Sequence, residues 1–293
     1  MGKLIIIEGT DGSGKQTQTE LLYKKLKEIK GEEEVKKISF PNYESRASEP
    51  VKMYLAGEFG KRAESVNAYA ASVLYSIDRF ASFKTEWEEF YNNGGIVISD
   101  RYTISNMIHQ VPKILDEKEK EKYLEWLVDL EWGKIGIPKP DIVFFLDIPF
   151  EFSQKLMKNR ENKITGEIKK DIHEKDKEYL RKSYETAKSL ALKYSWEIIS
   201  CVNNGKLKSI EEINDEIMKI INKNDVIAIA TIENEKYNLY PSRDVEITAT
   251  QRPNLKYTVN INSGVSKNSK GKIVGTYVAT DGTLTYSGEL IMK

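Results

Sequence analysis

A glycine-rich turn between an apolar run and a helical pattern constrains this chain more than any other feature of its sequence. The apolar run covers residues 4–7. The turn that follows reads Glu8-Gly9-Thr10-Asp11-Gly12-Ser13-Gly14-Lys15-Gln16-Thr17. Leu22, Leu26 and Ile29 then recur at helical spacing. A strand, a glycine turn and a helix form the context of a phosphate-binding P-loop.

Phosphate binding follows from the residue types in this turn. Gly9, Gly12 and Gly14 have no Cβ, so the backbone can approach an anion and point successive N–H groups at it. Lys15 adds a positive charge at the start of the expected helix, whose N-terminus favours anions. The P-loop motif has Ser or Thr after the lysine, as a Mg²⁺ ligand, whereas this chain has Gln16 and then Thr17. The alternative interpretation is an ordinary glycine-rich turn.

Composition narrows the class of protein. The 293 residues are enough for one large domain or two moderate ones. The formal net charge is +0, which argues against a nucleic-acid-binding protein, since these usually carry a basic excess. Cys201 is the only cysteine, as expected in a reducing compartment. No apolar run approaches the roughly 20 residues of a membrane span. Because the first residues already read as a strand, we expect no signal peptide and a cytoplasmic protein.

Strand and helix patterns alternate over residues 1–223. Further strands are expected at residues 35–40, 96–99, 142–148 and 196–201, and helices at residues 51–55, 63–91, 117–131, 151–158, 172–194 and 210–220. This alternation predicts an α/β fold with a five-stranded parallel sheet flanked by helices. Asp100 and Arg101 follow a central strand directly, at the edge where such sheets bind ligands.

The long helix expected at residues 63–91 carries two patterns. Apolar residues keep the helical period at Val66, Ala70, Val73, Ile77 and Phe80. Tyr75 and Arg79 are four residues apart and share a face.

Residues 226–293 differ from the rest of the chain. Short β-branched runs cover residues 226–232, 244–250, 256–262, 272–279 and 283–292, with turn residues between them. Asp281-Gly282 between two such runs is a hairpin signal. The pattern predicts a second, small all-β domain, for which no role and no family can be named.

Several motifs, in their order and spacing, make residues 1–223 resemble the thymidylate kinases, which are P-loop nucleoside monophosphate kinases. The motifs are residues 8–15, Phe40-Pro41, Tyr54-Leu55, Asp78-Arg79, Asp100-Arg101-Tyr102 with Ser105 and Gln110, and Pro140-Asp141 before Leu146-Asp147. The resemblance implies a P-loop kinase fold and transfer of the γ-phosphoryl group of ATP to dTMP, with Mg²⁺. It also implies a homodimer formed through helix faces.

The resemblance further implies a role for each site residue. Gly9, Thr10, Asp11, Gly12, Ser13, Gly14, Lys15, Gln16 and Thr17 would bind ATP. Asp11 would also bind the sugar 3′-hydroxyl of dTMP, Arg101 the acceptor phosphate, and Asp100 the magnesium. Phe40, Tyr75, Arg79, Ser105 and Gln110 would contact dTMP, with Tyr75 stacked on thymine and Arg79 at its 4-carbonyl oxygen. Residues 159–170 would form a lid. Arg160 is the first candidate in it for neutralising the phosphates, and Lys163 is the second.

Three departures from the family pattern leave alternatives open. Gln16 leaves the magnesium shell uncertain, Tyr43 stands where many relatives have an arginine, and His109 stands where many have an aromatic residue that helps to exclude a ribose. The alternatives are a kinase for another nucleotide or nucleoside, and a nucleotide-binding module that has lost catalysis.

Overall fold

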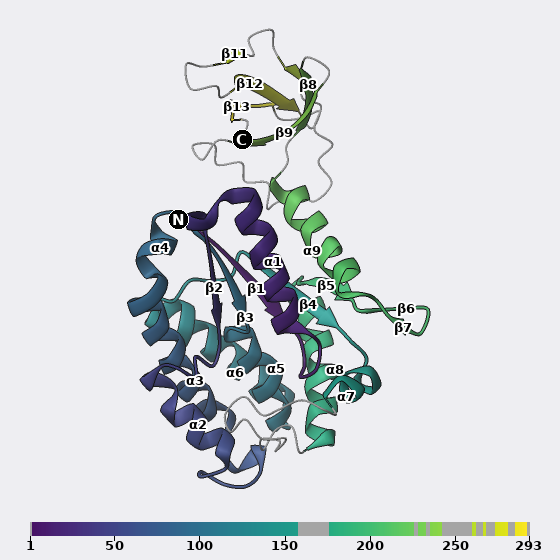
Figure 1. Cartoon of the computed structure of the whole chain (residues 1–293). Coiled ribbons are helices and arrows are strands. Elements are labelled where there is room, and N and C mark those ends of the chain that lie inside the picture. Colours follow the sequence, from purple (N-terminus) through teal and green to yellow (C-terminus); the bar gives the residue numbers. More distant parts are fainter. Residues whose placement is uncertain are drawn as a thin grey trace. The chain divides into compact units, whose positions relative to one another are not determined.

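The computed structural model describes residues 2–157, residues 176–225 and six strand segments of the remaining chain. These segments are residues 228–232, 235–241, 260–261, 266–267, 273–280 and 285–291. The chain divides into two compact units, Met1–Asp215 and Glu216–Lys293 (Figure 1). The expected boundary between residues 223 and 226 stays a prediction. The lid predicted at residues 159–170, with Arg160 and Lys163, lies outside the described residues.

The first unit is built on a parallel sheet of five strands. They are β1 (Lys3–Glu8), β2 (Val35–Ser39), β3 (Ile96–Asp100), β4 (Ile142–Asp147) and β5 (Glu197–Ser200). Their order is β2-β3-β1-β4-β5, so β1 is central. Ile7 lies opposite Asp100 in the β1–β3 pair, which brings the carboxyl ends of these strands together. The predicted five-stranded parallel sheet is confirmed.

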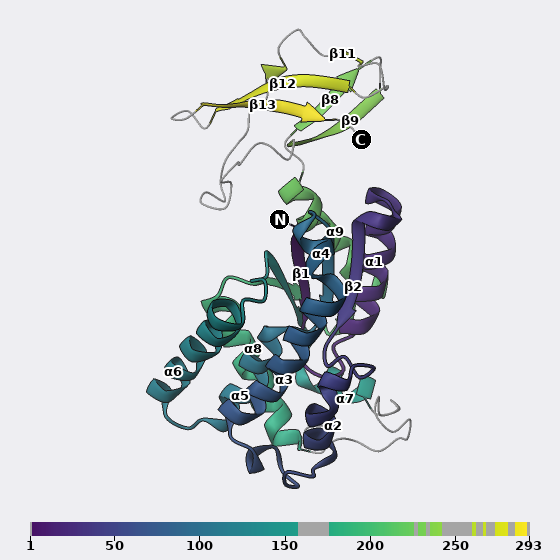
Figure 2. The ribbon, with the colours of Figure 1, turned by 90° about the vertical axis from the view of Figure 1, so that its left-hand side faces the viewer.

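Helices cover both faces of this sheet. Helix α1 (Lys15–Lys30) lies on one face, and the other carries α3 (Ala68–Ser82), α5 (Thr103–Gln110), α6 (Glu117–Val128) and α8 (Lys177–Lys193) (Figure 2). Leu4 and Ile6 of β1 are fully buried in the core under this second layer, with Met107 and Leu127. The shorter helices are α2 (Glu49–Ala56), α4 (Glu88–Asn92) and α7 (Phe150–Met157), and α9 spans Ile210–Asp225.

The long helix expected over residues 63–91 begins later, at Ala68, and is not α-helical throughout. A 3₁₀ turn, Ala63–Ser65, comes first, and α3 begins at Ala68 because the side chain of Asn67 caps it by accepting the N–H of Ala70 at 2.8 Å. A π-helical segment, Phe83–Trp87, separates α3 from α4. Apolar residues that keep the helical period in α3 face outward: Val73, Ile77 and Phe80 are 39%, 47% and 41% exposed.

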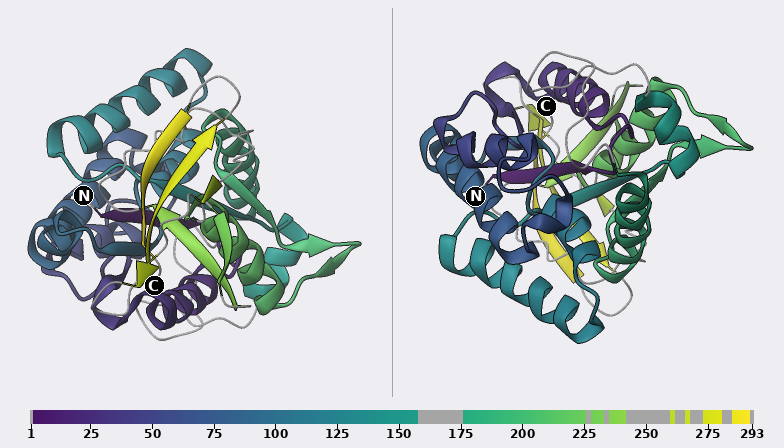
Figure 3. Two further views of the ribbon diagram at one scale, coloured as in Figure 1. Left: turned by 90° about the horizontal axis from the view of Figure 1, so that it is seen from above. Right: turned by 90° about the horizontal axis from the view of Figure 1, so that it is seen from below.

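Two further local features were not predicted. Helix α6 ends at Val128 and continues as the π-helical segment η6 (Asp129–Ile135). A hairpin of β6 (Val202–Asn203) and β7 (Lys206–Leu207) follows β5 and projects away from the sheet (Figure 3). Its turn residues Asn204 and Gly205 both have positive φ, of 48° and 73°. An Asn-Gly pair favours this two-residue turn, so the sequence held the signal.

The described part of the second unit contains strands β8 (Ala228–Ile232), β9 (Glu235–Pro241), β10 (Asn260–Ile261), β11 (Ser266–Lys267), β12 (Ile273–Thr280) and β13 (Thr285–Ile291). Strands β12 and β13 pair antiparallel, with Thr280 opposite Thr285, whereas a two-residue turn at Asp281-Gly282 would place Thr280 opposite Thr283. Strand β9 was not predicted, and the run at residues 244–250 lies outside the described residues. The separate all-β domain stays a prediction. Within the described ranges, no helix is long and apolar enough to cross a membrane.

Candidate active site

The glycine-rich turn runs from the end of β1 to the start of α1 and packs closely against its surroundings. Gly12 has a φ of 80°, which favours glycine. A Cβ there would lie only 2.6 Å from the carbonyl oxygen of Ser153 and 2.6 Å from Cγ of Met157, both on α7. The turn therefore needs glycine at position 12 for its backbone angle and for its close contact with α7.

The first turn of α1 leaves backbone N–H groups available for an anion. Gly14 is the N-cap, in a left-handed conformation with no side-chain cap, and the first turn carries no acidic residue. The N–H of Gln18 bonds to the carbonyl of Gly14 at 3.0 Å, so the N–H groups of residues 15–17 precede the intrahelical ladder. This arrangement favours a phosphate at the helix N-terminus.

Lys15 lies within the turn rather than in open solvent. Its side chain is 6% exposed and its Nζ donates to the carbonyl oxygen of Thr10 at 2.9 Å. Burial, with a smaller contribution from Arg101, lowers the pKa of Lys15 to about 8. Lys15 is therefore a charge donor held in place before any ligand is bound.

Arg101 follows β3 with an uncommon backbone conformation. Its φ of 69° is left-handed, which is rare for a residue with a side chain. The guanidinium forms an ion pair with Asp11, and its NH1 lies 3.3 Å from the Ser105 hydroxyl and 3.2 Å from His109 Nε2. Burial opposes the charge, but the carboxylates of Asp11 and Glu8 outweigh it and raise the pKa of Arg101. The predicted phosphate ligand therefore stays charged and is fixed by several partners.

Glu8 is a buried carboxylate at this centre to which the sequence assigned no role. It is 0% exposed, accepts the N–H of Gly9 at 3.0 Å and the hydroxyl of Ser105 at 2.7 Å, and lies 3.8 Å from Arg101. Burial raises the pKa of Glu8, against the opposing effect of Arg101 and Lys15. Ser105 is therefore engaged with the phosphate residues, and its predicted contact with the base stays untested.

His109 accepts a hydrogen bond from Arg101 rather than competing with it for charge. Burial, together with the positive charge of Arg101, lowers the pKa of His109 to about 3. The ring is then neutral near neutral pH, and Nε2 can act as the acceptor because arginine only donates. His109 therefore helps to hold the guanidinium of Arg101 in place.

A cavity of about 380 Å³ opens in front of the turn. Residues 12–18 line it, with Asp100 and Arg101. The remaining lining residues are largely apolar: Ile148, Leu156, Cys201, Leu207, Lys208, Ile210 and Ile213. Charged groups for phosphates and an apolar wall for a flat base thus lie in one cavity. The sequence analysis did not identify the apolar wall.

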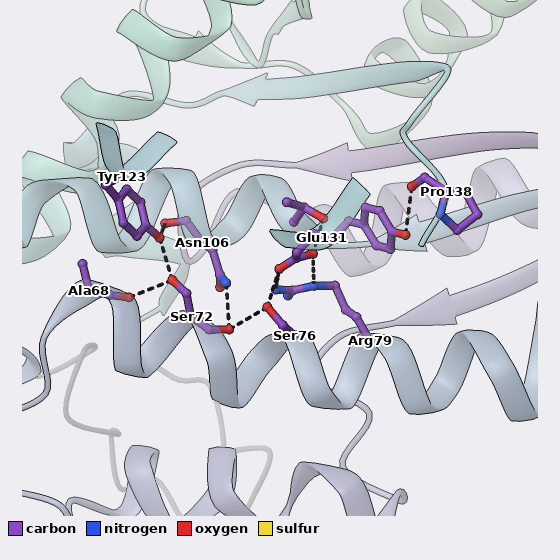
Figure 4. A network of polar contacts seen from close by, with 10 residues as sticks. Ala68, Ser72, Ser76, Arg79, Asn106, Tyr123, Glu131 and Pro138 are labelled. Carbon is purple, nitrogen blue, oxygen red and sulfur yellow. Dashed lines mark hydrogen bonds and ion pairs between the residues drawn. The ribbon is translucent and has the colours of Figure 1, made fainter. Parts of the chain in front are cut away.

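A second cluster of polar residues lies between α3, α5 and η6 (Figure 4). Arg79 is 1% exposed and its Nε and NH2 both donate to the carboxylate of Glu131, with Nε to Oε2 at 2.9 Å. Ser76 donates to Oε1 at 2.7 Å and Thr103 to Oε2 at 2.6 Å. No role was assigned to Glu131 from the sequence. It does follow Leu124 and Leu127 on the buried face of the helix, and this was the available signal.

The other residues expected to contact dTMP occupy separate environments. Tyr75 is partly buried, with its ring 6.3 Å from that of Tyr54 and nearly perpendicular to it. Phe40 is buried, with its ring 5.9 Å from that of Tyr102. Gln110 is 1% exposed, and its Oε1 has no hydrogen-bond partner among the described residues. A buried acceptor without a partner is costly unless a ligand supplies one.

Asp78, which precedes Arg79 on α3, connects this helix to the loop after β2. It is fully buried and accepts the backbone N–H of Asn42 at 2.8 Å through Oδ2. Burial raises the pKa of Asp78 to about 6, against the opposing effect of this hydrogen bond. Asp78 thus fixes the loop that follows Phe40-Pro41 to helix α3.

The residues beside the turn suit a hydrated divalent cation. Asp100 is 4% exposed, and its Oδ1 has no partner in the part of the chain that the structure describes. Asp100 and Thr17 both line the cavity, and both offer the oxygen ligands that Mg²⁺ prefers. No group of three or more potential His, Cys, Asp or Glu ligands is found among the described residues. A magnesium ion here would therefore depend on phosphate oxygens and water, as is usual at nucleotide sites.

The comparisons with known proteins agree with one another. The sequence model of the family described as thymidylate kinase matches residues 7–217. The thymidylate kinase of Plasmodium falciparum is 30% identical over 237 residues, covering 81% of this chain and 95% of the relative. The probable thymidylate kinase of Thermococcus kodakarensis is 30% identical over 218 residues, covering 72% and 98%. The solved structure of the Candida albicans thymidylate kinase matches with a TM-score of 0.57 and 23% identity, covering 76% of this chain and 92% of that one.

Proposed function

The chain belongs to the thymidylate kinase family and transfers the γ-phosphoryl group of ATP to dTMP, giving dTDP, and we propose that it does so at the carboxyl edge of the five-stranded sheet. One observation supports this location of the active site. Lys15, Asp100 and Arg101 line a single cavity together with the first turn of α1. Phosphoryl transfer asks the protein mainly to position its substrates and to neutralise charge. These residues supply both functions.

ATP binds in this proposal with its phosphates on the glycine-rich turn. The N–H groups at the start of α1 receive the phosphates, and Lys15 neutralises the transferred group. The apolar wall that includes Ile210 and Ile213 accommodates the adenine ring. Asp100 would hold magnesium through its carboxylate oxygen and water, and the ion would supply charge neutralisation at the phosphates.

dTMP binds on the other side of Arg101. Arg101 holds the acceptor phosphate, and Asp11, its present ion-pair partner, turns toward the 3′-hydroxyl of the sugar. Tyr75 stacks on thymine, Arg79 donates to the 4-carbonyl oxygen, and Phe40 and Gln110 complete the base site. Arg160 of the lid, with Lys163 as the second candidate, provides a further cation during transfer.

A homodimer formed through α3 is part of the same proposal. Val73, Ile77 and Phe80 repeat at helical spacing and are all more than a third exposed, and such an apolar stripe favours a partner surface. Light scattering of the protein tests this: the wild type should have twice the mass of the Ile77→Glu variant. Equal masses would contradict the proposed interface. We also propose a cytoplasmic location, which the single cysteine supports.

The decisive experiment measures ADP release with a panel of acceptors. dTMP should be used best, dUMP less well because it lacks the methyl group, and thymidine not at all because it lacks the acceptor phosphate. Ribosylthymine monophosphate tests whether His109 excludes a ribose. Preference for a different base would support another nucleotide kinase, and binding without turnover would support a module that has lost catalysis.

A further inference from the structure

In the buried ion pair between Arg79 and Glu131, the hydrogen-bonding capacity of the carboxylate is completely used. Each carboxylate oxygen of Glu131 accepts two donors. Oε1 receives Ser76 at 2.7 Å and Arg79 NH2, and Oε2 receives Arg79 Nε at 2.9 Å and Thr103 at 2.6 Å. Glu131 is 0% exposed. No capacity of this carboxylate is left for a ligand.

Arg79, by contrast, is only partly used by this pair. Its bonds to Glu131 come from Nε and NH2, whereas a guanidinium carries five N–H donors in a rigid planar arrangement. Since two of its three nitrogens are fixed on one carboxylate, the plane of the group and the direction of the third nitrogen are fixed too. Glu131 therefore determines where the remaining donors of Arg79 point.

The local backbone explains how Glu131 reaches this position. Glu131 lies in η6, whose wider π-helical turn follows α6 and ends at Gly136 in a left-handed conformation. The N–H of Ile137 bonds back to the carbonyl of Glu131 at 3.1 Å. Single π-helical turns inside α-helices occur frequently at functional sites. The buried charge of Glu131 is difficult to explain by stability alone, because a buried ion pair adds little net stability. The uncommon helix turn at the same residue is a second sign of a functional role.

We propose that Glu131 is a positioning residue for the base end of the substrate site. By holding Nε and NH2 of Arg79, it presents the remaining N–H donors of the guanidinium to the carbonyl oxygen of a pyrimidine base. A fixed set of donors favours a base with a carbonyl over one with an amino group at the same place, since arginine cannot accept a hydrogen bond. This inference rests on the contact between Arg79 and the base that is part of the proposed function.

A double-mutant cycle on steady-state kinetics tests the proposal. Glu131→Gln keeps the size of the side chain but removes its charge, and it should raise the KM for dTMP by about 10- to 100-fold, the usual effect of losing a well-oriented charged hydrogen bond. The KM for ATP should change little. In an Arg79→Ala background, Glu131→Gln should add almost nothing, because Glu131 acts only through Arg79. Glu125→Gln, at an exposed position of α6, is the matched control and should behave as wild type.

Each substitution leaves its partner as a buried charge, so circular dichroism must show that Glu131→Gln and Arg79→Ala are both folded under the assay conditions. If Glu131→Gln is not, the same cycle is run with Thr103→Val, which removes one donor to Glu131 and keeps the ion pair. Its expected increase in the KM for dTMP is about two- to five-fold, and this too should vanish in the Arg79→Ala background.

The outcomes separate this inference from the proposed function. An unchanged KM for dTMP in Arg79→Ala would remove Arg79 from the base site and this inference with it. If Arg79→Ala raises that KM while the effects of the two substitutions simply add, Arg79 keeps its role and Glu131 is not its positioning residue. Equal effects of Glu131→Gln on both substrates would also overturn the proposal.

Discussion

The proposed phosphate end and the proposed base end of the site are built in different ways. The phosphate end uses backbone: a glycine turn, the N–H groups that precede the intrahelical ladder of α1, and Lys15 held by the carbonyl of Thr10. The base end uses side chains from three helical segments, joined in the buried cluster of Arg79, Glu131, Ser76 and Thr103. Helix α5 lies between the two ends, because Thr103 bonds to the base cluster and Ser105 and His109 bond toward Arg101.

Because of this difference, substitutions at the two ends should affect catalysis and structural stability to different degrees. Lys15 can lose its charge while its helix and strand remain packed, so its substitution should affect rate and leave folding intact. Arg79 is a fully buried charge with one carboxylate partner, so its substitution should affect both folding and dTMP binding. Five experiments test this division.

The first experiment asks whether the phosphate end is complete without the lid. Arg160→Ala should lower turnover by about 10³–10⁵, as removal of an arginine from a phosphoryl-transfer site does, with little change in nucleotide affinity. Steady-state kinetics of Arg160→Ala beside Lys163→Ala measure the effect. Near-normal turnover in both variants would place the neutralising charge elsewhere.

The second experiment tests the structural role of the base end. Arg79→Ala should lower the free energy of unfolding by about 3–5 kcal/mol, since Glu131 is left as a buried charge without its partner. Urea denaturation gives the value. Replacement of both residues, as Arg79→Met with Glu131→Leu, should recover much of the stability but not the affinity for dTMP. A single variant as stable as the wild type would show that the pair is not structural.

The third experiment is the counterpart at the phosphate end. Lys15→Ala should lower turnover by about 10²–10³, because one preorganised charge donor is lost. Its unfolding midpoint should stay close to that of the wild type. Turnover within a few-fold of the wild type would remove Lys15 from the catalytic residues, and a large loss of stability would contradict the division between the two ends.

The fourth experiment uses pH to test the junction at Asp78. The folded-state pKa of about 6 exceeds the ordinary value of 3.8, so the folded state holds the proton more tightly than the unfolded state. The free energy of unfolding of the wild type, relative to that of Asp78→Asn, should therefore be highest near pH 4. It should decrease as pH rises through about 6. Urea denaturation of both proteins at several pH values measures it. Parallel pH dependence of the two proteins would contradict the raised pKa.

The smallest effect is expected from removing the second unit. Residues 1–223 alone should fold and phosphorylate dTMP at nearly the rate of the full chain, because both ends of the site lie in the first unit. Circular dichroism and the ADP-release assay check this. An insoluble or inactive fragment would show that the predicted two-domain division is wrong.

The contrast between the phosphate end and the base end also explains how much of the site the sequence could predict. The phosphate end lies mainly in ten consecutive residues, Glu8 to Thr17, whose pattern of glycine and lysine has a direct backbone meaning. The base end depends on a pair 52 positions apart in sequence, and on a π-helical turn that no local pattern signals. The roles of Tyr75 and Arg79 came only from the resemblance to a family. The helical spacing of Glu131 after Leu124 and Leu127 indicates burial but not its pairing with Arg79.

The outer face of α3 shows a second limit. The spacing of Val73, Ile77 and Phe80 correctly predicts a helix, but periodicity identifies an apolar face without identifying what covers it. In the structure the sheet-side face of α3 carries buried Ser72, Asp78 and Arg79, and the apolar face is exposed. Burial of polar residues needs hydrogen-bond partners from distant segments, and these are invisible in a single sequence.

The left-handed backbone of Arg101 puts two opposite demands on that position. A residue with a side chain in this conformation costs of order 1–2 kcal/mol, which glycine would avoid. Without the guanidinium, however, the buried Glu8 would lose the cation that lies 3.8 Å away. The strain at φ 69° is therefore offset by the charge that the same residue brings to its carboxylates, so glycine at this position would relax the backbone and still weaken the fold.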